Sequence, residues 1–384
     1  MHIVIEFLSR QSKSFLITMG VILIGLVASI DYLVEGDLSV LAFYLVPIIV
    51  VTWFVGKRNG LFISVVGAFA WAVADALATP IRVETLIYYW NFLEVLSVFV
   101  IVTIILSALR TTQDEKQRRE LEIAQEVQAD LFPKSLPSLS TLDYTAICKP
   151  AQGVSGDYYD FLLLERHTLG IAVGDVSGKG ISAALLMANL QGLLRSYAPQ
   201  RYTNLVELMS DINRSIFMST DQSRFATLFY GLYNDMTRIL TYVNAGQNPP
   251  ILLRLQGGRH VRITNPIDRP LAEDHTEQQS DESFRIIRLE TGGVPVGAFP
   301  DVVYNSETLQ LNQGDILVIF TDGIPDAKNS LDQEYGEERI GALVAENPEL
   351  SPIELRDLIL RDINQFMGSE LQFDDITLVI AKVV

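Results

Sequence analysis

The chain has 384 residues, of which 49% are hydrophobic, and a net charge of −17. That length is enough for two or three domains with full cores, and the acidic balance argues against a nucleic-acid partner, whose binding surface would be basic. Cys148 is the single cysteine, which excludes an internal disulfide and a cysteine-based metal site and fits a reducing cytoplasmic compartment.

Four long apolar segments occupy the first part of the chain, at residues 15–30, 38–55, 61–78 and 86–109. Each approaches or reaches the roughly 20 residues that cross a bilayer as a helix. Residues 1–110 carry six basic and seven acidic residues, so almost all of the negative charge lies beyond them. We therefore predict a four-span α-helical membrane module over residues 1–109.

The charges between these segments alternate in sign along the chain. Basic residues precede the first span, separate the second from the third and follow the fourth: Arg10, Lys13, Lys57, Arg58, Arg110, Lys116, Arg118 and Arg119. The other two loops carry Asp31, Glu35 and Asp37, then Arg82 and Glu84. The positive-inside rule therefore predicts a multi-pass protein of the inner (cytoplasmic) membrane with both termini in the cytoplasm.

Residues 110–136 have the pattern of an amphipathic linker helix. Apolar residues recur three and four positions apart on a charged background, and Pro133 and Pro137 end the pattern. The stripe, which includes Leu121, Ala124 and Val127, is too short for a stable coiled coil by itself. Two alternatives stay open, a parallel homodimer seeded by the membrane spans and a helix packed on its own catalytic domain.

Residues 137–384 alternate β-type runs with turns and helical patterns. Strands are expected at 171–175, 225–233, 239–244, 315–322 and 376–383, and helices at 181–197, 205–217, 339–346 and 352–366. Two helices follow one another and the strands are bunched elsewhere, which favours an α+β fold over a strictly alternating parallel one.

Short acidic motifs stand at the ends of several of these strands. Asp157, Asp175, Asp322 and Asp374 each adjoin an apolar run and a small residue or a turn. Hard divalent cations such as Mg²⁺ and Mn²⁺ take oxygen ligands of this kind. The pattern indicates a metal-dependent enzyme acting on phosphate. For any one of these residues, the alternative is a turn or a helix cap.

The segment 174–180, Gly-Asp-Val-Ser-Gly-Lys-Gly, has the look of a nucleotide-binding phosphate loop. That loop requires G-x-x-x-x-G-K-[ST], and alignment on Gly178 and Lys179 puts Val173 at the first glycine and Gly180 at the hydroxyl position. Both positions fail, which argues against a nucleotide hydrolase.

Six motifs in order carry a resemblance to a known family: 156–161, 174–180, 244–250, 297–300, 320–324 and 374–377. Together they resemble the metal-dependent PPM serine/threonine phosphatases, and within them the bacterial SpoIIE/RsbU-type branch. The lead-in at 124–133 is similar to the helix that enters this domain, so the resemblance covers about residues 120–384. It implies an α-β-β-α sandwich with a two-metal centre, Mn²⁺ or Mg²⁺, between the sheets.

The resemblance also implies roles for individual residues. Asp175 resembles the bridging metal ligand, Asp157, Asp322 and Asp374 the other carboxylates, and the backbone carbonyl of Val176 a further ligand. Asp375 is the alternative to Asp374, and because neighbours on a strand point to opposite faces only one of the pair should reach the metals. Phosphate-contact or turn positions are expected at Ser177, Gly178, Gly323 and Asn244.

Two departures from the family pattern concern acid–base chemistry. Ser177 stands where the wider family has a histidine, and Gln247 where the branch commonly has one, so neither residue can titrate near neutral pH. Residues 256–290 are longer and more polar than the resemblance implies and predict an extended surface hairpin.

The resemblance implies that water activated by two metals hydrolyses phosphoserine or phosphothreonine on a cytoplasmic signalling partner of the STAS (anti-anti-sigma) type. The membrane module would then set the activity. The alternative is a catalytically silent, membrane-anchored scaffold that binds a signalling partner through the same fold. The complete set of aspartates favours the enzyme.

Overall fold

The structure is a computed structural model that describes residues 2–34, 40–78, 85–165, 167–220, 224–256 and 283–384. The chain divides into two compact units, Met1–Glu120 and Leu121–Val384. Most of the two predicted external loops, at 35–39 and 79–84, and most of the predicted hairpin, at 257–282, lie outside the described residues.

The first unit is helical, with α1 (His2–Ser9), α2 (Lys13–Leu33), α3 (Leu41–Phe54), α4 (Lys57–Ala78) and the first part of α5 (Thr85–Ala129). Among the described residues, three helices are long and apolar enough to cross a membrane, α2, α4 and α5. The second predicted span forms α3, whose 14 residues extend roughly 21 Å, less than a bilayer core of about 30 Å. It ends just before Gly56, whose φ of 120° a helix cannot accommodate.

The helices of this unit pack closely and present an apolar surface. Tyr44, Ile48 and Val51 of α3 are fully buried against the neighbouring helices. A Cβ at Gly20 of α2 would lie 2.8 Å from a methyl carbon of Val51, so glycine permits this approach. Large apolar side chains such as Phe69, 66% exposed, cover the outside, as expected of a surface in contact with lipid.

The second unit contains two β-sheets. The five-stranded sheet has the order β1 (Leu142–Lys149), β11 (Ile376–Val383), β10 (Ile316–Phe320), β6 (Ile251–Gln256) and β7 (Ser283–Arg288). The six-stranded sheet has the order β2 (Tyr158–Leu164), β3 (Thr168–Val176), β4 (Ala226–Asn234), β5 (Ile239–Ala245) and β8 (Gly292–Gly293), with β9 (Glu307–Gln310) also paired to β5. The pairs are antiparallel except β5 with β8.

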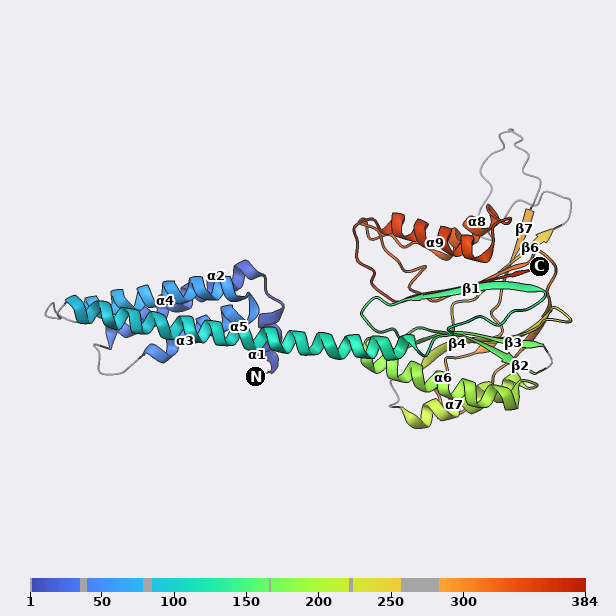
Figure 1. Cartoon of the computed structure of the whole chain (residues 1–384), viewed down its shortest axis with the longest axis horizontal. Helices are drawn as coiled ribbons and strands as arrows, with labels where there is room; N and C mark the ends of the chain where they lie inside the picture. The colour runs from blue at the N-terminus through green and yellow to red at the C-terminus, as the bar shows by residue number, and fades with distance from the viewer. Residues whose placement is uncertain (1, 35–39, 79–84, 166, 221–223, 257–282) are drawn as a thin grey trace, which may run out of the picture. The chain divides into compact units, whose positions relative to one another are not determined.

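The two sheets share a buried core, and a pair of helices covers each outer face. Phe161 and Ile171 of one sheet lie in the same apolar cluster as Leu317 and Val379 of the other. Helices α6 (Ile181–Arg201) and α7 (Leu205–Ser219) lie on the side of β2 to β5, and α8 (Glu337–Ala345) and α9 (Pro352–Met367) lie on the other (Figure 1). The α+β class predicted from the order of elements is confirmed.

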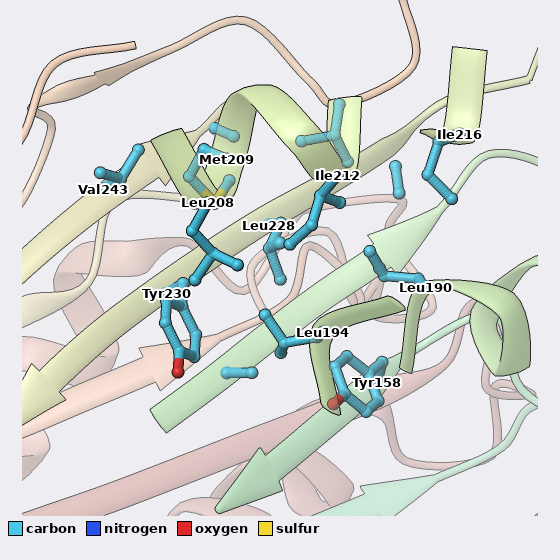
Figure 2. Packing of buried hydrophobic residues seen from close by; sticks show 14 of the residues in the cluster. Tyr158, Leu190, Leu194, Leu208, Met209, Ile212, Ile216, Leu228, Tyr230 and Val243 are labelled. Carbon is cyan, nitrogen blue, oxygen red and sulfur yellow. The ribbon is translucent and has the colours of Figure 1, made fainter. Parts of the chain in front are cut away.

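The helices over the six-stranded sheet are held by a continuous apolar layer. Leu190 and Leu194 of α6 meet Leu208 of α7 above the rings of Tyr158 and Tyr230 (Figure 2). This layer fixes α6, whose N-terminus follows the Asp175 motif directly, and so steadies one side of the candidate site.

Local signals explain where the helices begin. The side chain of Asn204 accepts a hydrogen bond from the backbone N–H of Glu207 and caps α7. Ser351 and Glu354 form a capping box at α9, with Pro352 in its first turn. α5 ends at Ala129, before Pro133, and is continuous from the last apolar segment into the predicted linker at 110–136.

Candidate metal centre

The four candidate carboxylates stand at strand ends of both sheets. Asp157 immediately precedes β2 and Asp175 is the penultimate residue of β3, and these strands are paired with Tyr158 opposite Gly174. Asp322 follows β10 and Asp374 precedes β11, and these strands are paired with Phe320 opposite Leu378. The topology thus brings two aspartates from each sheet to one end of the sandwich.

Asp157 lies deepest, with 1% of its surface exposed. The hydroxyl of Thr321 donates to its Oδ2 at 2.7 Å, and its backbone N–H donates to the Ser155 hydroxyl at 3.0 Å. Burial, and then the charge of Asp175, raises the pKa of Asp157 well above its usual range despite the hydrogen bond from Thr321. In its ionised form, the Asp157 carboxylate therefore lacks enough nearby positive charge to neutralise it.

The pKa of Asp175 is also raised. Burial, followed by the charges of Asp322 and Asp374, raises its pKa to about 7. Its backbone N–H donates to the hydroxyl of Thr227 on β4 at 3.3 Å. Asp322 and Asp374, which flank strands of the other sheet, are therefore near enough to act on Asp175 electrostatically.

Asp322 and Asp374 complete the cluster on the side of the five-stranded sheet. Burial and the charge of Asp374 raise the pKa of Asp322. The ammonium of Lys179 lies 2.8 Å from Asp374 Oδ2 and donates to the carbonyl of Phe373 at 2.9 Å. Lys179, from the Gly-Lys-Gly of the Asp175 motif, therefore balances part of the acidic charge.

The neighbouring Asp375 is differently engaged. Its Oδ1 accepts the backbone N–H of Ala151 at 2.7 Å, and its Oδ2 accepts the Ser155 hydroxyl at 2.9 Å and the Gly156 N–H at 2.8 Å. Both oxygens of Asp375 are thus occupied by the protein itself, whereas Asp374 faces the cluster and Lys179.

The remaining predicted positions surround the cluster in different ways. Val176 ends β3 and is buried, and Ser177 is bonded in both directions to Phe225, through its own N–H and through its hydroxyl. Gly178 is exposed in open space with φ 105°. Asn244 is buried near the end of β5, where its side chain accepts the N–H of Gln247 at 2.8 Å and donates to the carbonyl of Leu289 at 3.1 Å.

Gly323 has no room for a side chain, because a Cβ there would lie 1.9 Å from the carbonyl oxygen of Asp375. This close approach locks the turn after Asp322 onto the start of β11. The glycine is thus required by packing between the segments that carry Asp322 and Asp374.

The donor set fits a hard divalent cation. Carboxylates that raise one another's pKa in a buried cluster lack a counter-ion, and carboxylate oxygens are the ligands that Mg²⁺ and Mn²⁺ prefer. Across the residues that the structure describes, no three Asp, Glu, His or Cys side chains lie close enough to form a complete metal cage.

Two uncharged residues, Thr321 and Gln247, support the candidate carboxylates through hydrogen bonds that the motifs did not predict. Thr321 accepts the backbone N–H of Thr377 at 3.0 Å while donating to Asp157. Gln247 is buried, donates to the carbonyl of Phe320 at 2.9 Å and accepts the Thr227 hydroxyl, which links the ends of the two sheets. Thr321 and Gln247 lie inside the motifs at 320–324 and 244–250. Because buried polar groups need hydrogen-bond partners, their position in these motifs could have indicated a supporting role.

Comparison with known proteins places this fold in a family. The profile of Stage II sporulation protein E (SpoIIE) matches residues 165–286 and 278–384. Protein IcfG of Synechocystis is 28% identical over 298 residues, 70% of this chain and 42% of IcfG. Phosphoserine phosphatase RsbU of Bacillus subtilis is 31% identical over 220 residues, 57% of each chain.

A solved structure shows the same fold. The SiaA-PP2C domain of Pseudomonas aeruginosa matches with a TM-score of 0.55 and 16% identity, over 70% of this chain and 98% of that domain. The chain spans about half the length of the curated relatives that it matches. The family profile covers more than half of this chain, in agreement with the six ordered motifs, and the chain belongs to the SpoIIE family.

Proposed function

We propose that the chain is a membrane-anchored, metal-dependent protein-serine/threonine phosphatase. The observation that carries the proposal is the cluster of four aspartates from two sheets, in which burial and mutual repulsion raise the pKa of Asp157 and of Asp175. Such a cluster is stabilised by cations. RsbU, with which this chain shares 31% identity, is named a phosphoserine phosphatase, which supports the same reaction class here.

In this proposal Asp157, Asp175, Asp322 and Asp374, with the carbonyl of Val176, hold two divalent cations, Mn²⁺ or Mg²⁺. Bound cations of this kind supply hydroxide near neutral pH and neutralise charge on the phosphoryl oxygens. The protein's own part is to hold the carboxylates. Thr321 orients Asp157 and Thr227 supports the end of β3. Lys179 lies beside Asp374 and would balance its charge.

The proposed substrate is a phosphorylated signalling protein of the STAS type in the cytoplasm. The relatives RsbU and RsbP of Bacillus subtilis are both named phosphoserine phosphatases, which supports phosphoserine as the group hydrolysed. The acidic composition of this chain disfavours nucleic acid as a partner.

For the membrane unit we propose four spans with both termini in the cytoplasm. α2, α4 and α5 are long enough to cross, and α3 would take the fourth place within a locally thinned bilayer or with its flanking residues completing the span. Basic residues at Arg10, Lys57 and Arg110 support a cytoplasmic location for those ends.

The full-length protein in lipid nanodiscs tests the activity. We expect Mn²⁺-dependent release of phosphate from a phosphoserine STAS-domain protein, abolished by Asp175→Ala and retained by Asp143→Asn, which changes an exposed carboxylate on β1. No release by the wild-type protein with Mn²⁺, or equal release by Asp175→Ala, would favour the silent scaffold.

A further inference from the structure

Asp375 accepts several hydrogen bonds from a segment that lies far away in the sequence. Its two oxygens accept three hydrogen bonds, at 2.7 to 2.9 Å, from the backbone of Ala151, the hydroxyl of Ser155 and the backbone of Gly156. These donors lie more than 200 residues earlier in the chain. A carboxylate that accepts three protein hydrogen bonds has little capacity left for a cation.

The segment that Asp375 holds leads directly into Asp157. The Ser155 hydroxyl donates to Asp375 and accepts the backbone N–H of Asp157 at 3.0 Å, so it joins the two residues. A Cβ at Gly156 would lie 3.1 Å from the carbonyl oxygen of Val176, so this segment packs closely between Asp375 and the end of β3.

The backbone of Asp375 meets a second ligand-bearing turn. Its carbonyl oxygen lies against Gly323, the residue after Asp322, so closely that a Cβ at Gly323 would come within 1.9 Å of it. Asp375 also follows Asp374 directly, and its N–H donates to Asp374 Oδ1 at 2.9 Å. One residue therefore contacts the three segments that carry Asp157, Asp322 and Asp374.

We propose that Asp375 is a positioning residue, not a metal ligand: its carboxylate ties residues 151–156 to the start of β11 and so sets Asp157 against Asp322 and Asp374. The inference rests on the proposed function for the role of the aspartates that are positioned. Outer partners that orient metal-binding side chains typically contribute roughly 10- to 100-fold to metal affinity.

The test compares Asp375→Asn, Ser155→Ala and Asp374→Asn in the full-length protein in detergent micelles. Hydrogen exchange of residues 151–157 is measured without metal, and the number and affinity of bound Mn²⁺ ions are measured by electron paramagnetic resonance. Asn keeps the shape of Asp375, but its amide nitrogen cannot accept a hydrogen bond.

We expect Asp375→Asn to speed exchange at 151–157 and to weaken Mn²⁺ binding by roughly 10- to 100-fold while the number of ions at saturation stays the same. Ser155→Ala should shift both readouts in the same direction, and combining it with Asp375→Asn should add little, because the two residues share one contact. Asp374→Asn should instead lower the number of ions and leave exchange at 151–157 unchanged.

An Asp375→Asn protein that binds fewer Mn²⁺ ions at saturation, with unchanged exchange at 151–157, would overturn the inference and make Asp375 a ligand. Exchange and Mn²⁺ affinity both equal to the wild type would overturn it as well. If the wild-type protein binds no Mn²⁺, the proposed function fails. The exchange comparison in metal-free protein then still decides whether Asp375 holds the segment. Should Asp375→Asn fail to fold, Ser155→Ala probes the same contact from its other side.

Discussion

At the scale of single residues, the candidate site contains acidic side chains that repel one another electrostatically. Asp157 and Asp175 are buried near like charges, and the pKa of each is raised for that reason. A folded protein that contains such a cluster loses stability when the carboxyls ionise. Function and stability therefore compete at these positions, as they do at many binding sites.

The raised pKa of Asp175 gives a prediction with a definite sign. Below pH 4 the carboxyl is protonated in the folded and the unfolded chain. Between pH 4 and about 7 the unfolded chain ionises first, so this group's contribution to stability falls as pH rises through that window. In metal-free full-length protein, Asp175→Asn should therefore raise the melting temperature at pH 8 by a few degrees and by much less at pH 4.

Thermal unfolding of wild type and Asp175→Asn at both pH values, with a chelator present, checks this. Added Mn²⁺ should reverse the order at pH 8, because only the wild type gains the full binding free energy. A metal-free variant that is less stable than the wild type at pH 8 would contradict the account.

Thr321 gives a second prediction at this scale. Its hydroxyl lies between the N–H of Thr377 and Oδ2 of Asp157, and Val has nearly the same shape without the hydroxyl. We expect Thr321→Val to weaken Mn²⁺ binding roughly 10- to 100-fold. Thr321→Ser should recover most of the affinity. Wild-type affinity in Thr321→Val, together with a loss in Thr321→Ser, would show that packing of the methyl group, not the hydrogen bond, is what matters.

At the scale of elements, the end of α5 is attached to the segment that carries Asp157. Gln128 is buried, its amide N–H donates to the carbonyl of Ser155 at 2.7 Å, and its carbonyl accepts the Ser155 N–H at 2.8 Å. Of the two alternatives for the linker, packing on its own domain is thus observed at Gln128. Leu121, Ile123 and Val127 stay exposed and are available for the homodimer, which remains a proposal.

The contact at Gln128 predicts that α5 influences the site. Gln128→Ala should speed hydrogen exchange at residues 151–157 and change the rate of phosphate release by the full-length protein. Gln125→Ala on the same helix is the matched control, because Gln125 is exposed. Equal behaviour of the two variants would remove Gln128 from any coupling between the linker and the site.

Ile123 and Val127 are exposed on one face of α5, and these two stripe positions predict where a dimer would form. Cysteines at Ile123 or Val127, one helical turn apart, should give disulfide-linked dimers in membranes, in a protein whose Cys148 is replaced by serine. A cysteine at Glu122, exposed on another face of the helix, should give fewer. Absence of linked dimers at both stripe positions would leave α5 as an intramolecular element only.

Strand and helix patterns predicted most elements of the second unit, because its apolar runs are bounded by clear turns and caps. The predicted helices at 205–217 and 352–366 appear as α7 and α9 with nearly those bounds. The length of α3 was not predictable in the same way. Its apolar run continues to Val55, and the stop at Gly56 depends on a backbone angle that hydropathy does not report.

The candidate site also has a part that could be predicted from the sequence and a part that could not. Asp157, Asp175, Asp322 and Asp374 could be selected from their motifs, since strand ends bearing aspartate are recognisable in one dimension. Strand alternation predicted that only one of Asp374 and Asp375 would reach the metals. The donors at Ala151, Ser155 and Gly156 that hold Asp375 could not be predicted, because they lie far away in the sequence. The hydrogen bonds by which Thr321 and Gln247 support the strand ends could not be predicted for the same reason.

At the scale of the whole molecule, a helical unit with three apolar helices long enough to span a membrane shares one chain with a SpoIIE-family domain. The proposed membrane anchor would confine phosphatase activity to the cytoplasmic face, where a phosphorylated partner could reach it. The continuous α5 belongs to the sequence of both units, and its last turns contact the segment before Asp157.

The most direct test of the central claim is a Mn²⁺ titration of the full-length protein, with bound ions counted by electron paramagnetic resonance and phosphate release from a phosphoserine STAS-domain protein followed in the same samples. We predict that two Mn²⁺ ions bind, that hydrolysis rises with their binding, and that Asp175→Asn loses both. Hydrolysis that persists in excess chelator, or a wild-type protein that binds no Mn²⁺, would contradict the account.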